Sequence, residues 1–223
     1  TIIVSCEESG KSKQISFEDV ILYDEYSYYY SGTYQEIGFD AEGQLTSAVS
    51  YVTGDFEEVI YYTSGHGELQ IGASILDLLD KGNYTMTEIN TMMVTEIPKD
   101  CNLLLLNGPT VDLTADEKAM ISAYMQEGGN VLLLYGSTAE KLPNMDALLA
   151  EYGMNIVDGY VADAQRCYQQ VPYYIFPMMS LSGDMASNME TQMALMMYAR
   201  PMKLMDPARD TITVNSFLTT STY

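Results

Sequence analysis

Strand-sized runs of apolar residues constrain the fold of this chain most. Residues 103–106 are apolar at every position, which is typical of a strand that is buried on both faces of a parallel sheet. Residues 131–135 form a second run of this kind. Helix-like segments alternate with the strands, and parallel strands require such crossover connections. We therefore predict an α/β fold with a mainly parallel sheet, helices on both of its faces, and short extra strands at both ends.

Turn and capping residues set the expected boundaries of the elements. Gly54, Gly82 and Gly153 each follow a segment with helical spacing of apolar residues. Thr114-Ala115-Asp116-Glu117 has the form of a capping box at a helix start. We expect strands at residues 2–6, 14–15, 58–63, 84–92, 102–106, 131–135, 154–157, 203–205 and 211–218, and helices that include residues 68–79 and 144–152.

We expect one α/β domain over residues 1–223, organised in three parts. Residues 1–40 form a lead-in of short strands and a tyrosine-rich stretch. Residues 41–158 form the α/β core. Residues 159–223 form a methionine-rich part that packs on the core.

Two biased stretches allow either a structural or a binding interpretation. The crowded tyrosines of the lead-in either cover an edge hairpin or form a partner- or sugar-binding face, and the hairpin is favoured. Nine of the sixteen methionines lie in residues 178–205. Their spacing is helical, which favours a buried core face over an adaptable binding groove, at Met189, Met193, Met196 and Met197.

The charge of the chain excludes several classes of partner. It carries 10 Lys+Arg against 31 Asp+Glu, a formal net charge of −21. Such a surface repels the phosphates of nucleic acid and the head groups of an anionic leaflet. No apolar run approaches the roughly 20 residues of a membrane-spanning helix, so this segment itself is not expected to enter the membrane. Cys6, Cys101 and Cys167 show neither metal nor disulfide spacing.

The turn Gly65-His66-Gly67-Glu68 follows a strand-like segment and carries the only histidine of the chain. Ligands of open α/β sheets bind at the carboxyl ends of strands, so the turn is a candidate active centre. The two glycines equally permit a turn that exists for its shape and launches the next helix. From the residues alone, we favour the structural interpretation.

The motifs that catalysis or metal binding requires are incomplete. A zinc deaminase needs His-x-Glu together with Pro-Cys-x-x-Cys, and a zinc protease needs a second histidine. The segment Gly136-Ser137-Thr138-Ala139 follows a strand but lacks the second glycine of a nucleophile elbow. The sequence contains no Walker loop or dinucleotide-binding loop. We therefore predict no catalytic residue, no metal site and no cofactor.

Several short motifs stand in a fixed order along the chain: Leu45-Thr46-Ser47-Ala48, Tyr61-Tyr62-Thr63-Ser64-Gly65-His66-Gly67-Glu68, Ile97-Pro98-Lys99-Asp100, Asn107-Gly108-Pro109-Thr110-Val111-Asp112-Leu113, Glu127-Gly128-Gly129-Asn130-Val131 and Leu218-Thr219-Thr220-Ser221. Together they resemble the extracytoplasmic domain of ABC-transporter auxiliary proteins of the GldG (gliding-motility) type. The resemblance extends over nearly the whole chain.

The resemblance implies a bacterial protein on the extracytoplasmic face of the cytoplasmic membrane, anchored through segments outside the present sequence. It implies an ABC permease and an ATPase as partners. It also implies a flavodoxin-like or class I glutamine-amidotransferase-like core. The resemblance supplies no catalytic residue, and Cys101 precedes a strand, whereas the amidotransferase elbow cysteine follows one.

Our leading hypothesis is a non-catalytic binding or assembly domain of an ABC transport system. The main alternative is a hydrolase-like enzyme that acts on a carbohydrate or peptide at the His66 turn. The second alternative is a structural spacer between membrane segments. The expected ligand or partner contacts are Ser64, Gly65, His66, Gly67, Glu68, Asn107, Pro109, Asp112 and Ser137.

Overall fold

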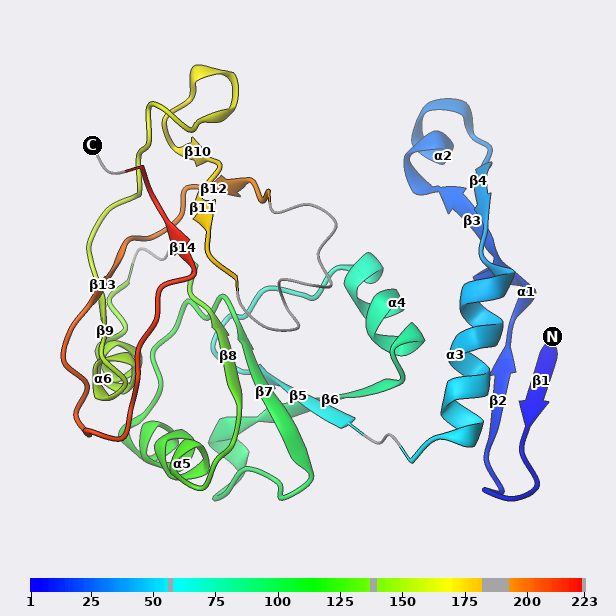
Figure 1. Ribbon diagram of the computed structural model, residues 1–223, viewed down its shortest axis with the longest axis horizontal. Coiled ribbons are helices and arrows are strands. Elements are labelled where there is room, and N and C mark those ends of the chain that lie inside the picture. The colour runs from blue at the N-terminus through cyan, green and yellow to red at the C-terminus, as the bar shows by residue number, and fades with distance from the viewer. Residues whose placement is uncertain (56–57, 137–139, 182–192, 222–223) are drawn as a thin grey trace. The chain divides into compact units, whose positions relative to one another are not determined.

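A four-stranded parallel sheet forms the core of the computed structural model, which describes residues 1–55, 58–136, 140–181 and 193–221. In spatial order its strands are β6 (Tyr84–Asn90), β5 (Glu58–Ser64), β7 (Cys101–Asn107) and β8 (Val131–Leu134) (Figure 1). The side chains of Leu104, Leu105 and Leu106 in β7 are buried. The predictions of an α/β fold with a parallel core and of a buried strand at residues 102–106 are therefore confirmed.

Three helices follow their predicted start and stop signals. The helix that begins after Asp40 ends at its C-cap, Gly54. At the capping box, the Glu117 N–H donates to the Thr114 hydroxyl and the Thr114 N–H donates to the Glu117 carboxylate. These local signals place α3 (Ala41–Thr53), α5 (Ala115–Gln126) and α6 (Pro143–Glu151).

The helix after the glycine turn starts later than predicted. It is α4 (Ala73–Lys81), not a helix that begins at Glu68. The Leu69 N–H donates to the Asn107 carbonyl (2.8 Å), and the Asn107 side-chain amide donates to the Leu69 carbonyl (2.8 Å). These bonds hold the backbone next to the end of β7 and out of a helix. The Leu69 side chain is 64% exposed.

The chain divides into two compact units. Unit 1 comprises residues 1–61, 70–87 and 100–103. Unit 2 comprises residues 62–69, 88–99 and 104–223. The three-part organisation inferred from the sequence remains a prediction.

The beginning of unit 1 is an antiparallel hairpin that packs against α3. Its strands, β1 (Ile2–Ser5) and β2 (Ser12–Ile15), confirm the two strands predicted at this end of the chain. A capping box of Ser16 and Asp19 then starts the short helix α1 (Phe17–Val20). The apolar side chains that these elements bury together are those of Ile15, Val20 and Ala48.

The tyrosine-rich stretch is a second hairpin in unit 1. Strands β3 (Ile21–Asp24) and β4 (Gln35–Phe39) pair antiparallel on either side of α2 (Glu25–Ser31). Tyr28 and Tyr34 stack with their ring centroids 4.8 Å apart. The hairpin interpretation is confirmed for the backbone, whereas Tyr30 is 90% exposed and does not cover the strands.

The end of the chain forms three small antiparallel pairs in unit 2. The strand predicted at residues 154–157 exists, but it pairs with the strand at residues 202–204 instead of extending the parallel sheet. The prediction of a strand at residues 211–218 is wrong except at Leu218, which begins β14 (Leu218–Thr219). The pairs are β9 (Met154–Ile156) with β13 (Met202–Leu204), β10 (Tyr174–Ile175) with β12 (Met196–Met197), and β11 (Met178–Met179) with β14 (Leu218–Thr219).

The predicted methionine-rich core helix is wrong where the structure describes it. Met196 and Met197 lie in strand β12. Met193 is 66% exposed, and Met189 lies outside the described residues. The helical spacing of the methionines gave a wrong prediction because residues 196–197 pair as a strand with residues 174–175. Among the helices of the described ranges, none is long and apolar enough to cross a membrane.

Candidate functional site

His66 lies in the turn directly after β5, in unit 2, and its side chain is 2% exposed. Both ring nitrogens face carboxylates. Nε2 lies 3.2 Å from Oε1 of Glu117, and Nδ1 lies 3.6 Å from Oε1 of Glu68. The imidazole is therefore enclosed between two acidic side chains and is closed to solvent.

The backbone of the turn has the conformation that its glycines were expected to permit. Gly65 and Gly67 have φ angles of 105° and 69°, a region that side-chain-bearing residues rarely adopt. A Cβ atom at Gly67 would collide with the hydroxyl of Thr110. The Thr110 N–H (2.8 Å) and the Val111 N–H (2.9 Å) both donate to the His66 carbonyl. The turn is thus fastened to the loop after β7.

Glu68 folds back onto the turn in which it lies. The His66 N–H donates to Oε2 of Glu68 (2.7 Å). Oε1 of Glu68 has no hydrogen-bond partner among the described residues and lies 3.6 Å from Nδ1 of the His66 ring. Glu68 therefore orients both the backbone and the ring of His66.

Glu117 joins three elements through its carboxylate. Its Oε1 accepts a hydrogen bond from the Thr91 hydroxyl (2.6 Å), and its Oε2 accepts from the N–H (2.9 Å) and hydroxyl (2.8 Å) of Thr114. Burial raises the pKa of Glu117, but these hydrogen bonds and the neighbouring His66 outweigh it and lower that pKa below its usual value. Glu117 is therefore an ionised anchor between α5, the His66 turn and the short helix η1 (Thr91–Met93).

The loop after β7 is also held by internal bonds. Pro109 is buried. Asp112 Oδ2 accepts from the N–H (3.0 Å) and the side-chain amide (2.9 Å) of Asn144, and Oδ1 accepts from the Met145 N–H (3.1 Å). Those two N–H groups belong to the first turn of α6, so Asp112 stabilises that helix start. Asn107 likewise uses its side chain to hold Leu69.

Most of the predicted contact residues take part in hydrogen bonds within unit 2, at the His66 turn, at Asn107 and at Asp112. Gly65 and Gly67 are exposed, Ser64 is half-buried, and Ser137 lies outside the described residues. Thr91 and Glu117 are the members that the sequence did not associate with His66. Glu117 was visible only as part of a capping box, because 51 residues separate it from His66.

This arrangement does not match the order of groups in nucleophilic catalysis. In a catalytic triad, histidine lies between a nucleophile and an acid, whereas His66 lies between two acids. The hydroxyl of Thr91 donates to Glu117 and not to the ring. Within the part of the chain that the structure describes, no group of three or more His, Cys, Asp or Glu side chains is arranged to hold a metal ion.

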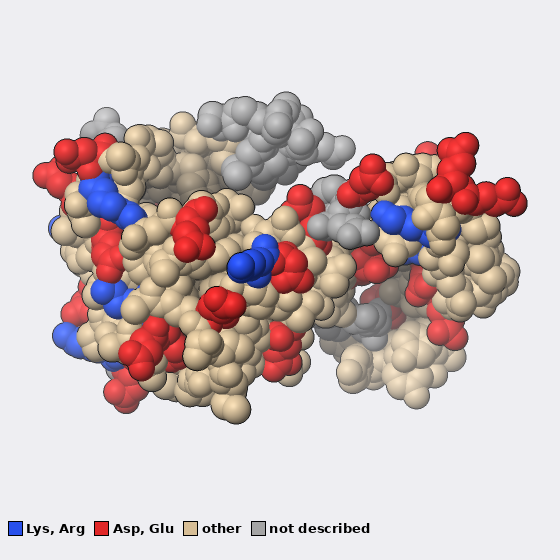
Figure 2. Space-filling view, turned by 90° about the horizontal axis from the view of Figure 1, so that it is seen from below, with Lys and Arg blue, Asp and Glu red and all other residues tan. Residues whose placement is uncertain are grey.

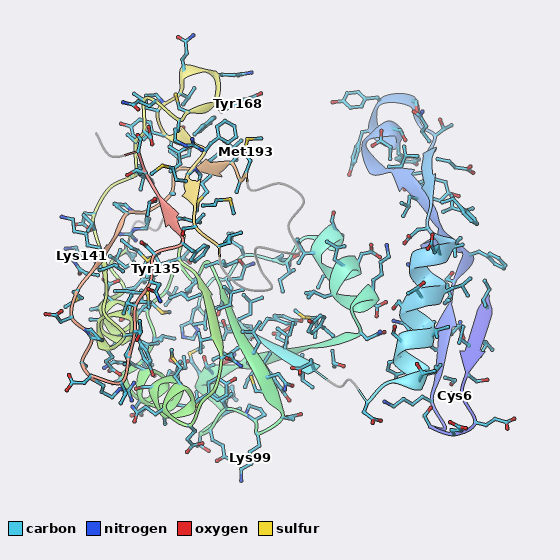
Figure 3. All side chains as sticks on the ribbon, in the orientation of Figure 1. Cys6, Lys99, Tyr135, Lys141, Tyr168 and Met193 are labelled. Carbon is cyan, nitrogen blue, oxygen red and sulfur yellow. The ribbon has the colours of Figure 1, made fainter. Side chains whose placement is uncertain are left out.

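A separate hollow of about 500 Å³ lies in unit 2, next to the carboxyl end of β8. Tyr135 follows β8 directly, and Lys141 lies close to it just before α6 (Figure 3). The strand pair β9–β13 contributes Asn155, Ile156 and Lys203 to the wall. The hollow was not predicted from the sequence, since part of its wall forms only when β13 pairs with β9.

Comparison with known proteins adds one family and one fold. A family model described as an ABC-type uncharacterized transport system matches residues 57–223. A solved structure titled "mmIFT52 N-terminal domain" matches with a TM-score of 0.52 and 18% sequence identity, covering 66% of this chain and 69% of that chain. At that identity, the match shows similarity of fold alone. No curated protein matches the sequence.

Proposed function

Because this chain belongs to the family described as an ABC-type uncharacterized transport system, we propose that it is a non-catalytic auxiliary domain that binds or assembles other components of such a system. The family match carries the proposal. It covers the β5–β8 sheet, the His66 turn and the end of the chain, and it begins after α3.

The geometry around His66 supports the non-catalytic role. A general base has to reach the proton that it removes, and the His66 ring is shielded from solvent by Glu68 and Glu117. The hydrogen bonds of Glu117 are directed at its own helix start and at Thr91. The polar groups of the turn serve the fold, which leaves a hydrolase without an accessible base at this position.

The outer side of the turn is the contact surface in this proposal. Three exposed apolar side chains belong to the turn or to segments that contact it, namely those of Leu69, Met92 and Val111. Leu69 directly follows Glu68 in the sequence. The Val111 N–H donates to the His66 carbonyl, and Met92 lies against Gly65. Exposed apolar groups on a rigidly held loop are suited to protein contact.

We further propose the finer placement that the GldG-type resemblance implies. The domain lies on the extracytoplasmic face of the bacterial cytoplasmic membrane, is anchored through segments outside the present sequence, and works with an ABC permease and an ATPase. The core is flavodoxin-like or class I glutamine-amidotransferase-like. The net charge of −21 supports contact through protein partners, since anionic lipid head groups repel such a surface.

Co-purification of the full-length protein from detergent-solubilised membranes tests the assembly role. We expect a permease and an ATPase to be recovered with the wild-type protein and with Val49→Asp. We expect Val111→Asp to reduce that recovery several-fold. Val49 is a matched control because it is similarly exposed (49% against 55% for Val111) but lies on α3. Recovery of the protein alone, under conditions that preserve other ABC complexes, would contradict the proposal.

A further inference from the structure

The hollow beside β8 concentrates positive charge in an acidic chain. Three of the ten basic residues of the chain line it, namely Lys141, Arg200 and Lys203. Figure 2 shows how sparse basic side chains are on one face of the molecule, where acidic ones are spread widely. A local excess of cations in a protein with a net charge of −21 attracts anions to that one position.

The acidic residues of the hollow contact Arg200 and Tyr135, and not the two lysines. Asp158 forms a long ion pair with Arg200, with 3.8 Å between the carboxylate and the guanidinium, and its side chain is 86% exposed, so solvent screens the pair. Asp146 accepts a hydrogen bond from the Tyr135 hydroxyl (2.8 Å). Across the described ranges of the chain, the side chains of Lys141 and Lys203 have neither an ion pair nor a hydrogen bond.

One of the cations is held in place before any ligand arrives. The guanidinium of Arg200 lies over the ring of Tyr135, 5.1 Å from its centroid, and the Arg200 side chain is only 14% exposed. Burial and the hydrogen bond to Asp146 raise the pKa of Tyr135, so the ring stays a neutral phenol. A guanidinium fixed in this way presents its N–H groups to an anion at little cost in conformational entropy.

We propose that this hollow binds a soluble small molecule that carries a phosphate group. A doubly charged, multi-oxygen anion matches two free ammonium groups and one fixed guanidinium better than a single carboxylate does. The volume of about 500 Å³ lies within the range of small-molecule sites. The location is the carboxyl end of a parallel strand, where α/β sheets bind ligands. The inference goes beyond the assembly role and does not depend on it.

Isothermal titration calorimetry with pyrophosphate tests this site on the purified 223-residue chain without partners. We expect saturable binding at one site that weakens as NaCl is raised. The double variant Lys141→Gln/Lys203→Gln should weaken binding at least about tenfold, because two charge-assisted contacts are lost. Lys99→Gln should leave binding unchanged, since it removes one positive charge of unit 2 outside the hollow.

Three outcomes would overturn the inference. Equal weakening in Lys99→Gln and in the double variant would mean that pyrophosphate senses net charge and not this hollow. A second measurement, sedimentation with vesicles of phosphatidic acid in phosphatidylcholine, distinguishes a lipid phosphate from a soluble one. If the protein sediments with the vesicles only when Lys141 and Lys203 are present, and does not bind pyrophosphate, the proposal of a soluble ligand is rejected. It is also rejected if the protein binds neither pyrophosphate nor the vesicles.

Discussion

Two polar clusters of unit 2 use their charges in opposite ways. Around His66, each carboxylate faces a hydrogen-bond donor or the imidazole ring, and the ring is closed to solvent. In the hollow beside β8, Lys141 and Lys203 lie at the surface, and Arg200 has one distant carboxylate neighbour. In the first cluster, Glu117 is fully engaged within the chain and Oε1 of Glu68 faces only the His66 ring. In the second cluster, the two lysines have no acceptor among the described residues.

The difference indicates which of the two clusters can bind a small ligand. Buried polar groups that satisfy one another stabilise a unique arrangement and leave nothing for a ligand to bind. Cations kept apart from the many acidic residues of the chain retain their capacity to bind an anion. The polar groups of the His66 turn therefore stabilise the fold. The hollow lined by Lys141 and Arg200 is the better candidate for ligand binding, although no sequence motif marks it.

Glu117→Ala should have the largest effect on stability. Removing the carboxylate leaves the Thr91 hydroxyl, the Thr114 N–H and the His66 ring without their common acceptor. Breaking a buried charged network of this kind costs about 3–5 kcal/mol of unfolding free energy. Urea unfolding followed by far-UV circular dichroism measures the loss. Glu127→Ala, at the exposed end of α5, should stay within about 0.5 kcal/mol of wild type, and an equally small loss in Glu117→Ala would mean that the cluster does not hold the fold.

Gly67→Ala should destabilise the same cluster by a smaller amount. Alanine at φ 69° costs about 1–2 kcal/mol, and its Cβ atom would also collide with the Thr110 hydroxyl. Gly72→Ala is the matched control, because its backbone is ordinary (φ −63°) and no atom lies within 4 Å of the added carbon. The added Thr110→Ala change should recover part of the loss in Gly67→Ala. No recovery would show that the collision does not contribute.

Local sequence signals predicted the elements that depend on neighbours in the chain. The capping box at Thr114 and the stop at Gly54 are satisfied within a few residues. The buried strand around Leu104–Leu106 needed only its apolar composition. Each of these features depends on local geometry or on burial, which a single sequence reveals.

The features that the sequence did not reveal depend on distant partners. The later start of α4 follows from the bonds between Leu69 and Asn107, 38 residues apart. The role of Glu117 follows from His66, which lies 51 residues away. The hollow exists because β13 pairs with β9 and so brings Lys203 next to Asn155. No periodicity or spacing in the sequence encodes such pairings.

Acid should weaken the His66 cluster through Glu117. The folded-state pKa of this group lies below its unfolded value, so its contribution is present above about pH 4.3, the ordinary pKa of glutamate, and is lost as the pH falls through the folded pKa. The pKa of Glu151 is also lowered. Burial raises this pKa, but the hydrogen bonds from Lys118 and Ser122 outweigh that effect. Urea midpoints measured from pH 6 to pH 3 should fall less steeply in Glu117→Gln than in wild type. Parallel curves for the two proteins would refute the assignment.

Removing the free cations of the hollow should have the smallest effect on the fold. Lys141→Gln/Lys203→Gln is expected to change the unfolding free energy by no more than about 0.5 kcal/mol, because neither side chain has a partner in the described part of the chain. Lys118→Gln provides the contrast, since its ammonium lies 2.6 Å from Glu151 and its loss should cost about 1 kcal/mol. Pyrophosphate should raise the melting temperature of wild type and of Lys118→Gln but not of the double variant, because a ligand stabilises only a protein that binds it. A double variant that unfolds as easily as Glu117→Ala would show that these lysines serve the fold, and the contrast between the two clusters would then be wrong.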